Sequence, residues 1–450
     1  MEQVYVKDLL LATGGTLLCG EENTPVYDIV TDSRTLKKGD LFVPLKGEKV
    51  DAHRFLDQAV SSCSAAFTME PVEDAWCQKD CALIAVEDTL TAMQQVAAML
   101  RSRYQIPVIG VTGSVGKTTT REMIAKALSS EKKVFETIKN YNSQVGVPLT
   151  LAKLDSSYEI AVLEMGMSNF GEMQRLSDMV RPDTAVMTCI GVAHIEQLKT
   201  QENIRAEKLK IISHMKKEDV IYLNGDDPLL YACKDQLPCT IVWYGLGSHN
   251  DFRAENCRIE GEKNVFELVH EAQRVTVRLQ AMGEHNVRNA LVALAVASQY
   301  GVALDKAAAA LSDFAGQRQR IVKTSWFTMI DDTYNASPDS MRASLKVLSD
   351  FPTAGRKIAV LADMLELGPD TEKFHRQVGA CVKENGIDYL ITYGELSRFI
   401  AEEAEVDGMH AESLEQVADY LRQEVKPEDV VLLKGSNGMN LKQVVKQFDK

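Results

Sequence analysis

The 450-residue sequence has no hydrophobic run long enough to cross a membrane as a helix. Such a helix needs about 20 consecutive apolar residues. The longest candidate, residues 290–302, is shorter and is interrupted by Ser298, Gln299 and Gly301. No basic segment precedes the brief apolar run near the first residue, so no signal peptide is expected. The sequence therefore predicts a soluble, cytoplasmic protein without a membrane span.

Basic residues are fewer than acidic ones: 50 Lys and Arg stand against 64 Asp and Glu, a formal net charge of −14. This balance excludes a nucleic-acid-binding protein that relies on a broad basic surface. It allows a local phosphate site, where backbone N–H groups and one lysine suffice. A hydrophobic share of 45% and a charged share of 25% exclude a disordered chain. We expect a multidomain enzyme.

The nine cysteines show no paired pattern. The pairs closest in sequence, Cys77 with Cys81 and Cys233 with Cys239, lack C-x-x-C spacing, and no second pair lies at the distance of a zinc site. We therefore expect reduced thiols and no zinc.

The length predicts about three domains. Residues 1–103 mix short apolar runs with an amphipathic helix at 89–101. In residues 104–320, apolar strands alternate with helix-length segments, which is typical of a parallel α/β sheet. Residues 321–450 repeat that alternation without a G-x-G-x-x-G motif, which disfavours dinucleotide binding. The predicted fold is α/β, with a small mixed domain, a central P-loop domain with a parallel sheet, and a Rossmann-like open C-terminal domain.

The most specific motif is T-G-S-V-G-K-T, which lies between a predicted buried strand and a predicted helix. Gly113 and Gly116 allow phosphate to approach the backbone N–H groups at the helix start. Lys117 can then reach the β- and γ-phosphates, and the Thr118 hydroxyl can bind Mg²⁺. An ordinary glycine-rich turn is the alternative, and the complete strand–turn–helix pattern favours nucleotide binding. The predicted phosphate-binding residues are Thr112, Gly113, Ser114, Val115, Gly116, Lys117, Thr118 and Thr119.

Three chemically active side chains follow strands of the predicted central sheet. Glu164 ends one apolar strand, His194 follows the next, and Lys208 lies fourteen residues after His194. Ligands bind at the carboxyl ends of parallel strands, and Mg²⁺ prefers oxygen ligands. Glu164 is therefore a candidate magnesium ligand, with His194 as a less usual companion. Taken singly, His194 and Lys208 also fit ordinary surface positions. Together with Glu164, however, they are predicted to lie at the same edge of the sheet as the Lys117 loop.

Asparagine and aspartate gather at two later positions. Asn286 and Asn289, near the start of an apolar helix, could cap that helix or hydrogen-bond an adenine edge. Asp331 and Asp332 end a predicted strand before T-Y-N-A-S-P, a turn that accounts for Asn335 but not for two adjacent aspartates.

Taken in order, these segments resemble the Mur ligase family. The motifs that carry the resemblance are T-G-S-V-G-K-T, N-Y-N-S-Q-V-G-V-P-L-T (140–150), E-M-G-M-S, A-H-I-E, G-E-H-N-V-R-N and D-D-T-Y-N-A-S-P. T-D-S-R (31–34) with G-D-L-F-V (39–43) is similar to the family's UDP-sugar-binding domain. D-D-T-Y-N-A-S-P and A-D-M-L-E-L-G (362–368) are most similar to the members that add D-alanyl-D-alanine. The D-N-P-[RK] string of the member that adds diaminopimelate or lysine is absent.

The resemblance implies specific roles around the phosphates. Lys117 and Thr118 would hold ATP phosphates and Mg²⁺, and Glu164 and His194 would ligate a second Mg²⁺. Lys208 aligns with the family's carbamoylated lysine, whose carboxylate would face that ion. The implied catalytic residues are Lys117, Lys208, His194 and Arg318.

The resemblance also implies how nucleotide and substrate bind. Asn286 and Asn289 resemble the adenine-side pair, and Asp332 resembles the ribose-side acid. Arg318 resembles the arginine near the γ-phosphate, although Arg320 fits the same register. The implied substrate-binding residues are Ser33, Arg34, Asn140, Asn142, Ser143, Asn335 and Ser337.

The implied activity is that of an ATP- and Mg²⁺-dependent amide ligase. It would add D-alanyl-D-alanine to UDP-N-acetylmuramoyl-tripeptide through an acyl phosphate, in peptidoglycan precursor synthesis. Two alternatives stay open: another amino acid ligase of the same scaffold, including the folylpolyglutamate type, and a P-loop regulatory module. A dehydrogenase is disfavoured because the dinucleotide fingerprint is missing.

Overall fold

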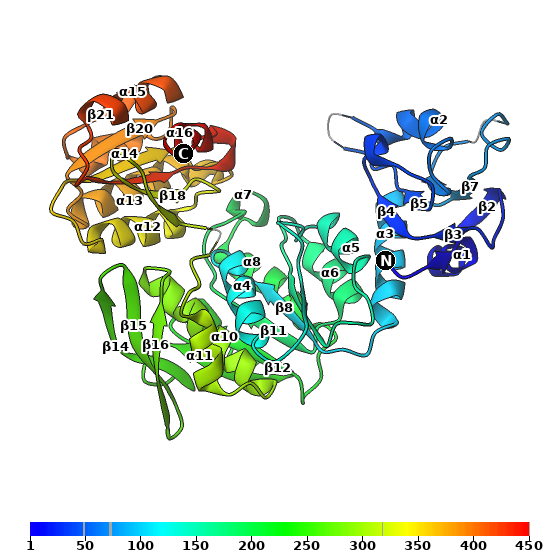
Figure 1. Ribbon diagram of the computed structural model, residues 1–450, viewed down its shortest axis with the longest axis horizontal. Coiled ribbons are helices and arrows are strands. Elements are labelled where there is room, and N and C mark those ends of the chain that lie inside the picture. Colours follow the sequence, from blue (N-terminus) through cyan, green and yellow to red (C-terminus); the bar gives the residue numbers. More distant parts are fainter. Residues whose placement is uncertain (48–49, 72–73, 317, 450) are drawn as a thin grey trace.

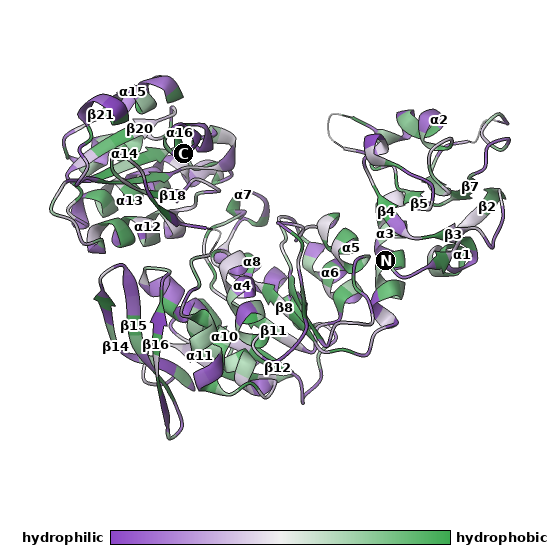
Figure 2. Ribbon diagram, in the orientation of Figure 1, coloured by the Kyte–Doolittle hydropathy of each residue, from purple (hydrophilic) through white to green (hydrophobic). Residues whose placement is uncertain are grey.

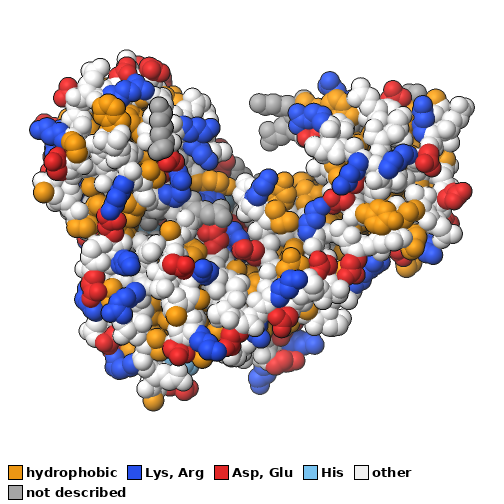
Figure 3. Space-filling view, in the orientation of Figure 1, with side chains coloured by type: hydrophobic (Ala, Val, Ile, Leu, Met, Phe, Trp, Pro, Cys, Tyr) orange, Lys and Arg blue, Asp and Glu red, His pale blue; other side chains and the backbone are white. Residues whose placement is uncertain are grey.

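The computed structural model describes residues 1–47, 50–71, 74–316 and 318–449, which form three lobes (Figure 1). Each lobe contains its own α/β sheet, which confirms the predicted fold class. Figure 3 shows the surface hollowed between the two outer lobes, above the central one. Every helix in the described ranges is too short or too polar to cross a membrane.

The N-terminal lobe contains a five-stranded sheet of order β2-β7-β6-β5-β4, in which only β2 runs antiparallel to its neighbour. An antiparallel pair, β1–β3, completes the lobe. The predicted amphipathic helix is α3, which buries Met93, Val96 and Leu100 against the strand residue Ile84. The strands are β1 Val4–Tyr5, β2 Thr16–Cys19, β3 Pro25–Val26, β4 Asp28–Val30, β5 Asp40–Phe42, β6 Ala65–Thr68 and β7 Ala82–Ala85. The helices are α1 Val6–Thr13, α2 Leu56–Ala59 and α3 Thr89–Ser102, with short 3₁₀ turns η1 Ser33–Thr35 and η2 Ala52–Phe55.

The expectation of reduced thiols throughout is wrong in this lobe. Cys19, the last residue of β2, forms a disulfide with Cys77, and their Cα atoms lie 5.5 Å apart. Cys63 and Cys81 stay unbonded, with their sulfur atoms 3.5 Å apart. Spacing in the sequence does not indicate this disulfide, because Cys19 and Cys77 are 58 positions apart. Cys77 lies in the turn before β7, and β7 pairs antiparallel with β2, which ends at Cys19.

The central lobe contains a nine-stranded sheet of order β16-β15-β14-β13-β12-β11-β8-β10-β9. From β9 to β14 all neighbours are parallel, as predicted, whereas β14, β15 and β16 form an antiparallel extension that sequence analysis missed. The strands are β8 Val108–Thr112, β9 Val134–Glu136, β10 Ile160–Glu164, β11 Thr184–Met187, β12 Val220–Asn224, β13 Thr240–Gly245, β14 Phe252–Glu260, β15 Lys263–His270 and β16 Gln273–Leu279. The helices are α4 Lys117–Leu128, α5 Gly146–Leu151, α6 Glu172–Val180, α7 Ile195–Leu198, α8 Gln201–Leu209, α9 Pro228–Tyr231, α10 Glu284–Gln299 and α11 Leu304–Leu311, with the 3₁₀ turn η3 Lys210–Ile212.

The central strands are continuous apolar runs because helices cover both faces of the sheet. Ile109 and Val111 of β8 pack in one cluster with α4 and α10, while Val108 packs in another with α6. Figure 2 shows the contrast with strands β14–β16, where hydrophilic residues are mixed with hydrophobic ones. The buried strands hold the loops at their carboxyl ends in fixed positions.

The C-terminal lobe contains a six-stranded open sheet of order β17-β18-β22-β19-β20-β21, parallel except for the edge strand β17. The Rossmann-like prediction is confirmed. The strands are β17 Arg320–Lys323, β18 Thr328–Asp332, β19 Lys357–Ala362, β20 Tyr389–Tyr393, β21 Gly408–Ala411 and β22 Val430–Lys434. The helices are α12 Pro338–Asp350, α13 Thr371–Glu384, α14 Arg398–Ala404, α15 Leu414–Glu424 and α16 Lys442–Phe448, with 3₁₀ turns η4 Gly368–Asp370 and η5 Asn437–Met439.

Candidate active site

The predicted phosphate loop joins β8 to α4 at the carboxyl edge of the central sheet. Gly113 has φ +147°, and a Cβ atom there would lie 1.9 Å from the Thr188 hydroxyl oxygen, just after β11. Gly116, with φ +87°, is the N-cap of α4. Both positions need glycine, because a side chain would clash at the first and strain the backbone at the second. The loop therefore presents its backbone at the positive end of α4.

Two lysines converge on one carbonyl of this loop. The Lys117 ammonium donates to the carbonyl oxygen of Gly113 at 3.0 Å, and the Lys208 ammonium, from α8, donates to the same oxygen at 2.9 Å. Lys208 is only 1% exposed. Its burial, and then the charge of Lys117, lowers the pKa of Lys208 well below its usual range. The charged form of Lys208 is therefore disfavoured, and Lys117 is the lysine that carries positive charge at the loop.

His194 belongs to the same electrostatic cluster. It is the N-cap residue of α7, with φ +63°. Burial lowers the pKa of His194 to about 4, with further lowering by Lys117 and Lys208. The imidazole is therefore neutral at pH 7, which is the form that binds metal ions.

Glu164 ends β10 and lies directly beside the phosphate loop. One carboxylate oxygen accepts from the Thr118 hydroxyl at 2.9 Å, and the other accepts from the Asn142 side-chain amide at 2.6 Å. Its backbone N–H donates to the Thr137 hydroxyl at 2.7 Å. Glu164 is 1% exposed, so these bonds hold a buried carboxylate in place.

Magnesium can be tested against this donor set. Thr118 and Glu164 bring two oxygen donors together, and Mg²⁺ is commonly held by one or two carboxylates plus substrate phosphates. In the described part of the chain, no three Asp, Glu, His or Cys side chains gather into a ready-made metal site. The residues fit a magnesium ion that takes its remaining ligands from a nucleotide.

Arg318 reaches this site from the connection to the third lobe. A guanidinium N–H donates to the Thr118 hydroxyl at 3.3 Å, and the guanidinium carbon lies 2.9 Å from the centre of the Tyr334 ring. The Tyr334 hydroxyl accepts from the Asn140 side chain at 3.3 Å. Arg320 instead pairs with two carboxylates of the C-terminal lobe, Asp331 and Asp449. The structure therefore places Arg318, and not Arg320, at the phosphate loop.

Asn286 and Asn289 lie on α10, where it packs against α4. The Asn289 side chain accepts from the Thr120 hydroxyl at 3.0 Å and donates to Asn286 at 3.2 Å, while Asn286 donates to the Met282 carbonyl at 2.7 Å. The N-cap of α10 is Gly283, so neither asparagine caps the helix. Both side chains are buried beside the phosphate loop, and their adenine-side role stays a prediction.

Asp332 ends β18 in the C-terminal lobe. Its carboxylate accepts from the Lys434 ammonium at 2.7 Å and from the Ser344 hydroxyl at 2.5 Å. Lys434 is 2% exposed and also donates to the backbone carbonyl of Asn335 at 2.9 Å. Lys434 had no predicted role. Its position at the end of an apolar strand could have indicated a role, because Asp332 also ends a strand of the same predicted sheet.

Comparisons with known proteins match this arrangement to one family. Residues 111–297 match the Mur ligase middle domain, and residues 317–437 match the domain described as Mur ligase, glutamate ligase domain. The chain is 38% identical to the UDP-N-acetylmuramoyl-tripeptide–D-alanyl-D-alanine ligase of Bacillus subtilis, over 98% of both chains. The chain belongs to the Mur ligase family.

Solved structures agree over nearly the full length of this Mur ligase. It superposes on the crystal structure of MurF from Acinetobacter baumannii with a TM-score of 0.91 and 29% identity, over 99% of both chains. MurF from Thermotoga maritima in complex with ADP gives a TM-score of 0.85 and 27% identity, over 94% of this chain and 97% of that one. The resemblance identified from the motifs is confirmed.

The predicted substrate residues of this Mur ligase occupy three separate places. Ser33 and Arg34 lie in η1 of the N-terminal lobe, between β4 and β5 and apart from the phosphate loop (Figure 1). Arg34 pairs with Asp32 at 2.6 Å and is largely exposed. The other predicted residues are Asn140, Asn142 and Ser143 in the loop after β9, and Asn335 and Ser337 after β18.

These residues are not equally available to a substrate. Asn142 is bonded to Glu164, and the Ser143 hydroxyl accepts from the Gly146 N–H at 3.3 Å. Ser337 is the N-cap of α12, where its hydroxyl accepts from the Ser340 N–H. Arg34, Asn140, Ser143 and Asn335 are exposed. Their substrate roles stay predictions.

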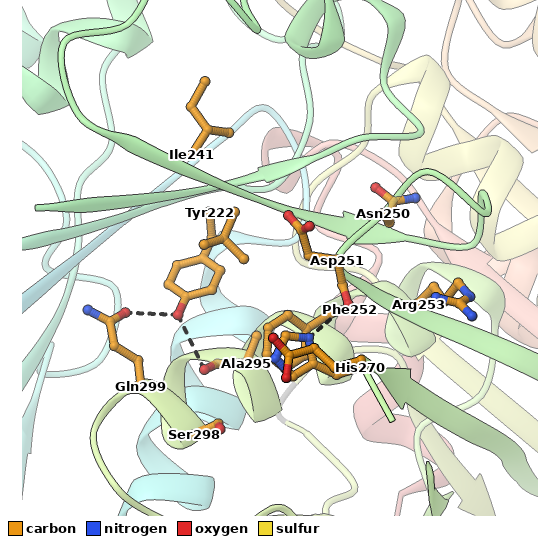
Figure 4. A pocket seen from close by; sticks show the side chains of 12 residues that line it. Tyr222, Ile241, Asn250, Asp251, Phe252, Arg253, His270, Ala295, Ser298 and Gln299 are labelled. Carbon is orange, nitrogen blue, oxygen red and sulfur yellow. Dashed lines mark hydrogen bonds between the residues drawn. The ribbon is translucent and has the colours of Figure 1, made fainter. Parts of the chain in front are cut away.

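A surface cavity of about 590 Å³ lies away from this site, between β13, β14 and the end of α10 (Figure 4). The Tyr222 hydroxyl donates there to the Gln299 side chain at 2.8 Å, and the Phe252 and His270 rings stack. None of the predicted site residues lines this cavity.

Proposed function

We propose that this Mur ligase adds D-alanyl-D-alanine to UDP-N-acetylmuramoyl-tripeptide, with conversion of ATP to ADP and phosphate, in peptidoglycan precursor synthesis. The full-length match to D-alanyl-D-alanine ligases carries the substrate assignment. The contact of Thr118 with both Glu164 and Arg318 supports phosphoryl transfer at the loop.

The chemical problem is that a carboxylate is a poor electrophile. Transfer of the γ-phosphoryl group from ATP to the peptide carboxylate forms an acyl phosphate and ADP. The amine of D-alanyl-D-alanine then attacks the acyl carbon, the C–O bond to phosphate breaks, and the amine loses a proton. Phosphoryl transfer mainly requires positioning and neutralisation of spread negative charge. Lys117 and Arg318 would provide both.

Thr118 would hold one Mg²⁺ ion together with the ATP phosphates, and Glu164 and His194 would hold a second; when bound, these ions neutralise phosphate and oxyanion charge. The Thr118–Glu164 hydrogen bond brings the hydroxyl donor and the carboxylate donor side by side. Asn142 donates to the other carboxylate oxygen, and the Thr137 hydroxyl accepts from the Glu164 backbone N–H, so Glu164 is oriented before ligands arrive.

Lys208 fits the family's carbamoylated lysine. It is buried and shares the Gly113 carbonyl with Lys117, so its charged form is unfavourable there. The uncharged amine adds to CO₂, forming an N–C bond and releasing one proton. The product is a carbamate with one negative charge, which would offset Lys117 and supply oxygen atoms to a site that has few carboxylates.

The outer lobes have a physical role in this chemistry. Water would hydrolyse an acyl phosphate, so water must be excluded from the active site during the reaction. The hollow between the outer lobes offers the space in which the peptide and the dipeptide could meet (Figure 3). We place the reaction in the cytoplasm, where ATP and UDP-linked precursors are available, and propose that the protein acts as a monomer.

The deciding experiment is mass spectrometry of the product formed from UDP-N-acetylmuramoyl-tripeptide, ATP and D-alanyl-D-alanine. The expected product carries one added dipeptide and appears together with stoichiometric ADP and phosphate. A panel of amine acceptors, including diaminopimelate, lysine and glutamate, separates this reaction from other ligases of the scaffold. ATP binding without any covalent product would contradict the proposal and favour a regulatory module.

A further inference from the structure

The turn that carries His194 is packed into another lobe. Val192 and Ile195 flank His194 in sequence, and both pack against the hydrophobic core of the C-terminal lobe, beside residues such as Leu367. The turn belongs to the central lobe by chain order, but its apolar side chains contact the third lobe. The position of His194 is therefore coupled to the docking of that lobe.

The loop after β19 completes this contact. Gly368, with φ +65°, packs so closely on Glu196 that a Cβ atom there would lie 3.3 Å from the Glu196 Cα. Glu366, two residues earlier, points its carboxylate at His194, with Oε2 3.3 Å from the imidazole Nδ1. His194 and Glu366 both have positive φ, 63° and 62°, a conformation uncommon for residues other than glycine. Such backbone outliers persist where the surrounding structure enforces them, and they gather at functional sites.

The imidazole presents its two nitrogen atoms differently. Nδ1 is buried, and no described residue makes a hydrogen bond to it, although the Glu366 carboxylate lies within ion-pair distance. The His194 side chain as a whole is 27% exposed. Because Nδ1 is buried, the exposed part is the remainder of the side chain. A metal-binding histidine commonly donates its second N–H to a carboxylate, which fixes the tautomer and the ring orientation. Glu366 lies where that carboxylate would be.

We propose that Glu366 is a positioning residue, which orients His194 through Nδ1 so that Nε2 can bind the metal ion. This inference rests on the proposed function only in taking His194 as a metal ligand. It gives the C-terminal lobe a role at the metal ion: its docking completes the metal site of the central lobe.

The test is a double-mutant cycle on Mn²⁺ binding to the full-length protein. Free Mn²⁺ is counted by electron paramagnetic resonance for the wild type, Glu366→Gln, His194→Ala and the double variant. Loss of a carboxylate that orients a ligating histidine typically weakens metal binding about 10- to 100-fold. We expect Glu366→Gln to show a loss of this size in the wild-type background and none in the His194→Ala background.

A matched control is Glu372→Gln on α13. Glu372 has 56% side-chain exposure, close to the 62% of Glu366, and lies in the same lobe, paired with Arg376. This variant is expected to bind Mn²⁺ like the wild type, and Glu366→Asp is expected to recover part of the affinity. Equal losses from Glu366→Gln in both histidine backgrounds, or no loss in either, would overturn the inference. Because Mn²⁺ binding needs no turnover, failure here is distinguishable from failure of the ligase assay.

Discussion

The two halves of the site are built by different means. Lys117, Thr118, Glu164 and Lys208 belong to the central lobe, and Glu164 and Lys208 are each 1% exposed. The other half crosses a lobe boundary through Arg318, Tyr334 and Glu366, and Tyr334 is 44% exposed. The first half is fixed by the packing of one sheet. The second half depends on how the lobes dock, because Tyr334 contacts Asn140 and Glu366 contacts His194 across the lobe boundary.

The largest effect is expected in the buried half. Lys117→Ala should reduce product formation by about 1,000-fold or more, because a fixed charge at the transferring phosphoryl group is lost. Product is measured by mass spectrometry and by amine-dependent ADP release. The matched control, Lys126→Ala, removes an exposed lysine from the same helix, where it pairs with Asp313, and should keep wild-type turnover. Normal turnover by Lys117→Ala would remove this lysine from the role given to it.

Arg318 tests the half that crosses the lobe boundary. Arg318→Ala should lower kcat by about 1,000-fold, the effect of an arginine that stabilises phosphoryl-transfer charge. Arg320→Ala is the comparison: it breaks surface ion pairs, which typically contribute about 0–1 kcal/mol to stability. Steady-state kinetics of both variants at saturating ATP provide the measurement. A loss confined to Arg320→Ala would reverse the assignment.

Substitution of Lys208 tests whether the buried half needs the carboxylate of a carbamoylated lysine. Lys208→Ala should lower activity about 10- to 100-fold, as expected for a group that supports a metal site. Formate or acetate should restore part of the rate by occupying the place of the missing carbamate, whereas neither should restore Lys117→Ala. Absence of rescue, together with an unmodified Lys208 in ¹³CO₂ NMR of the wild type, would count against carbamoylation.

The smallest effect is expected at Tyr334. Tyr334→Ala removes the ring beneath Arg318, a cation–π contact of about 0.5–1 kcal/mol at exposed sites. This corresponds to a decrease of about 2- to 5-fold in kcat/KM. Tyr334→Phe keeps the ring and loses only the bond from Asn140, so it should stay closer to the wild type. Equal values for both variants would show that the ring does not support Arg318.

Local patterns predicted the buried half well. Strand, glycine turn and helix follow one another without interruption around Lys117, so their geometry is contained in about twenty residues. Glu164 was identified because it ends an apolar strand, and strand ends of a parallel sheet share one edge. These predictions match the structure because the segments concerned are determined by interactions between residues that are close in sequence.

Contacts between distant segments were not predicted. The Cys19–Cys77 disulfide depends on the antiparallel pairing of β2 with β7. The antiparallel extension β14–β16 was missed because a parallel pattern was expected across the whole block. Lys434 meets Asp332 only because β22 lies beside β18 in the sheet. The spacing of residues in the sequence does not indicate which distant segments become neighbours in the structure.

The order of residues along the chain was enough to determine the α/β class, the phosphate loop and the family, since each depends on contiguous segments. Tertiary structure alone decided that Arg318 and not Arg320 faces Thr118, and that Glu366 meets His194. The reason is physical: backbone geometry follows from neighbouring residues, whereas a contact between lobes depends on how two independently folded cores dock.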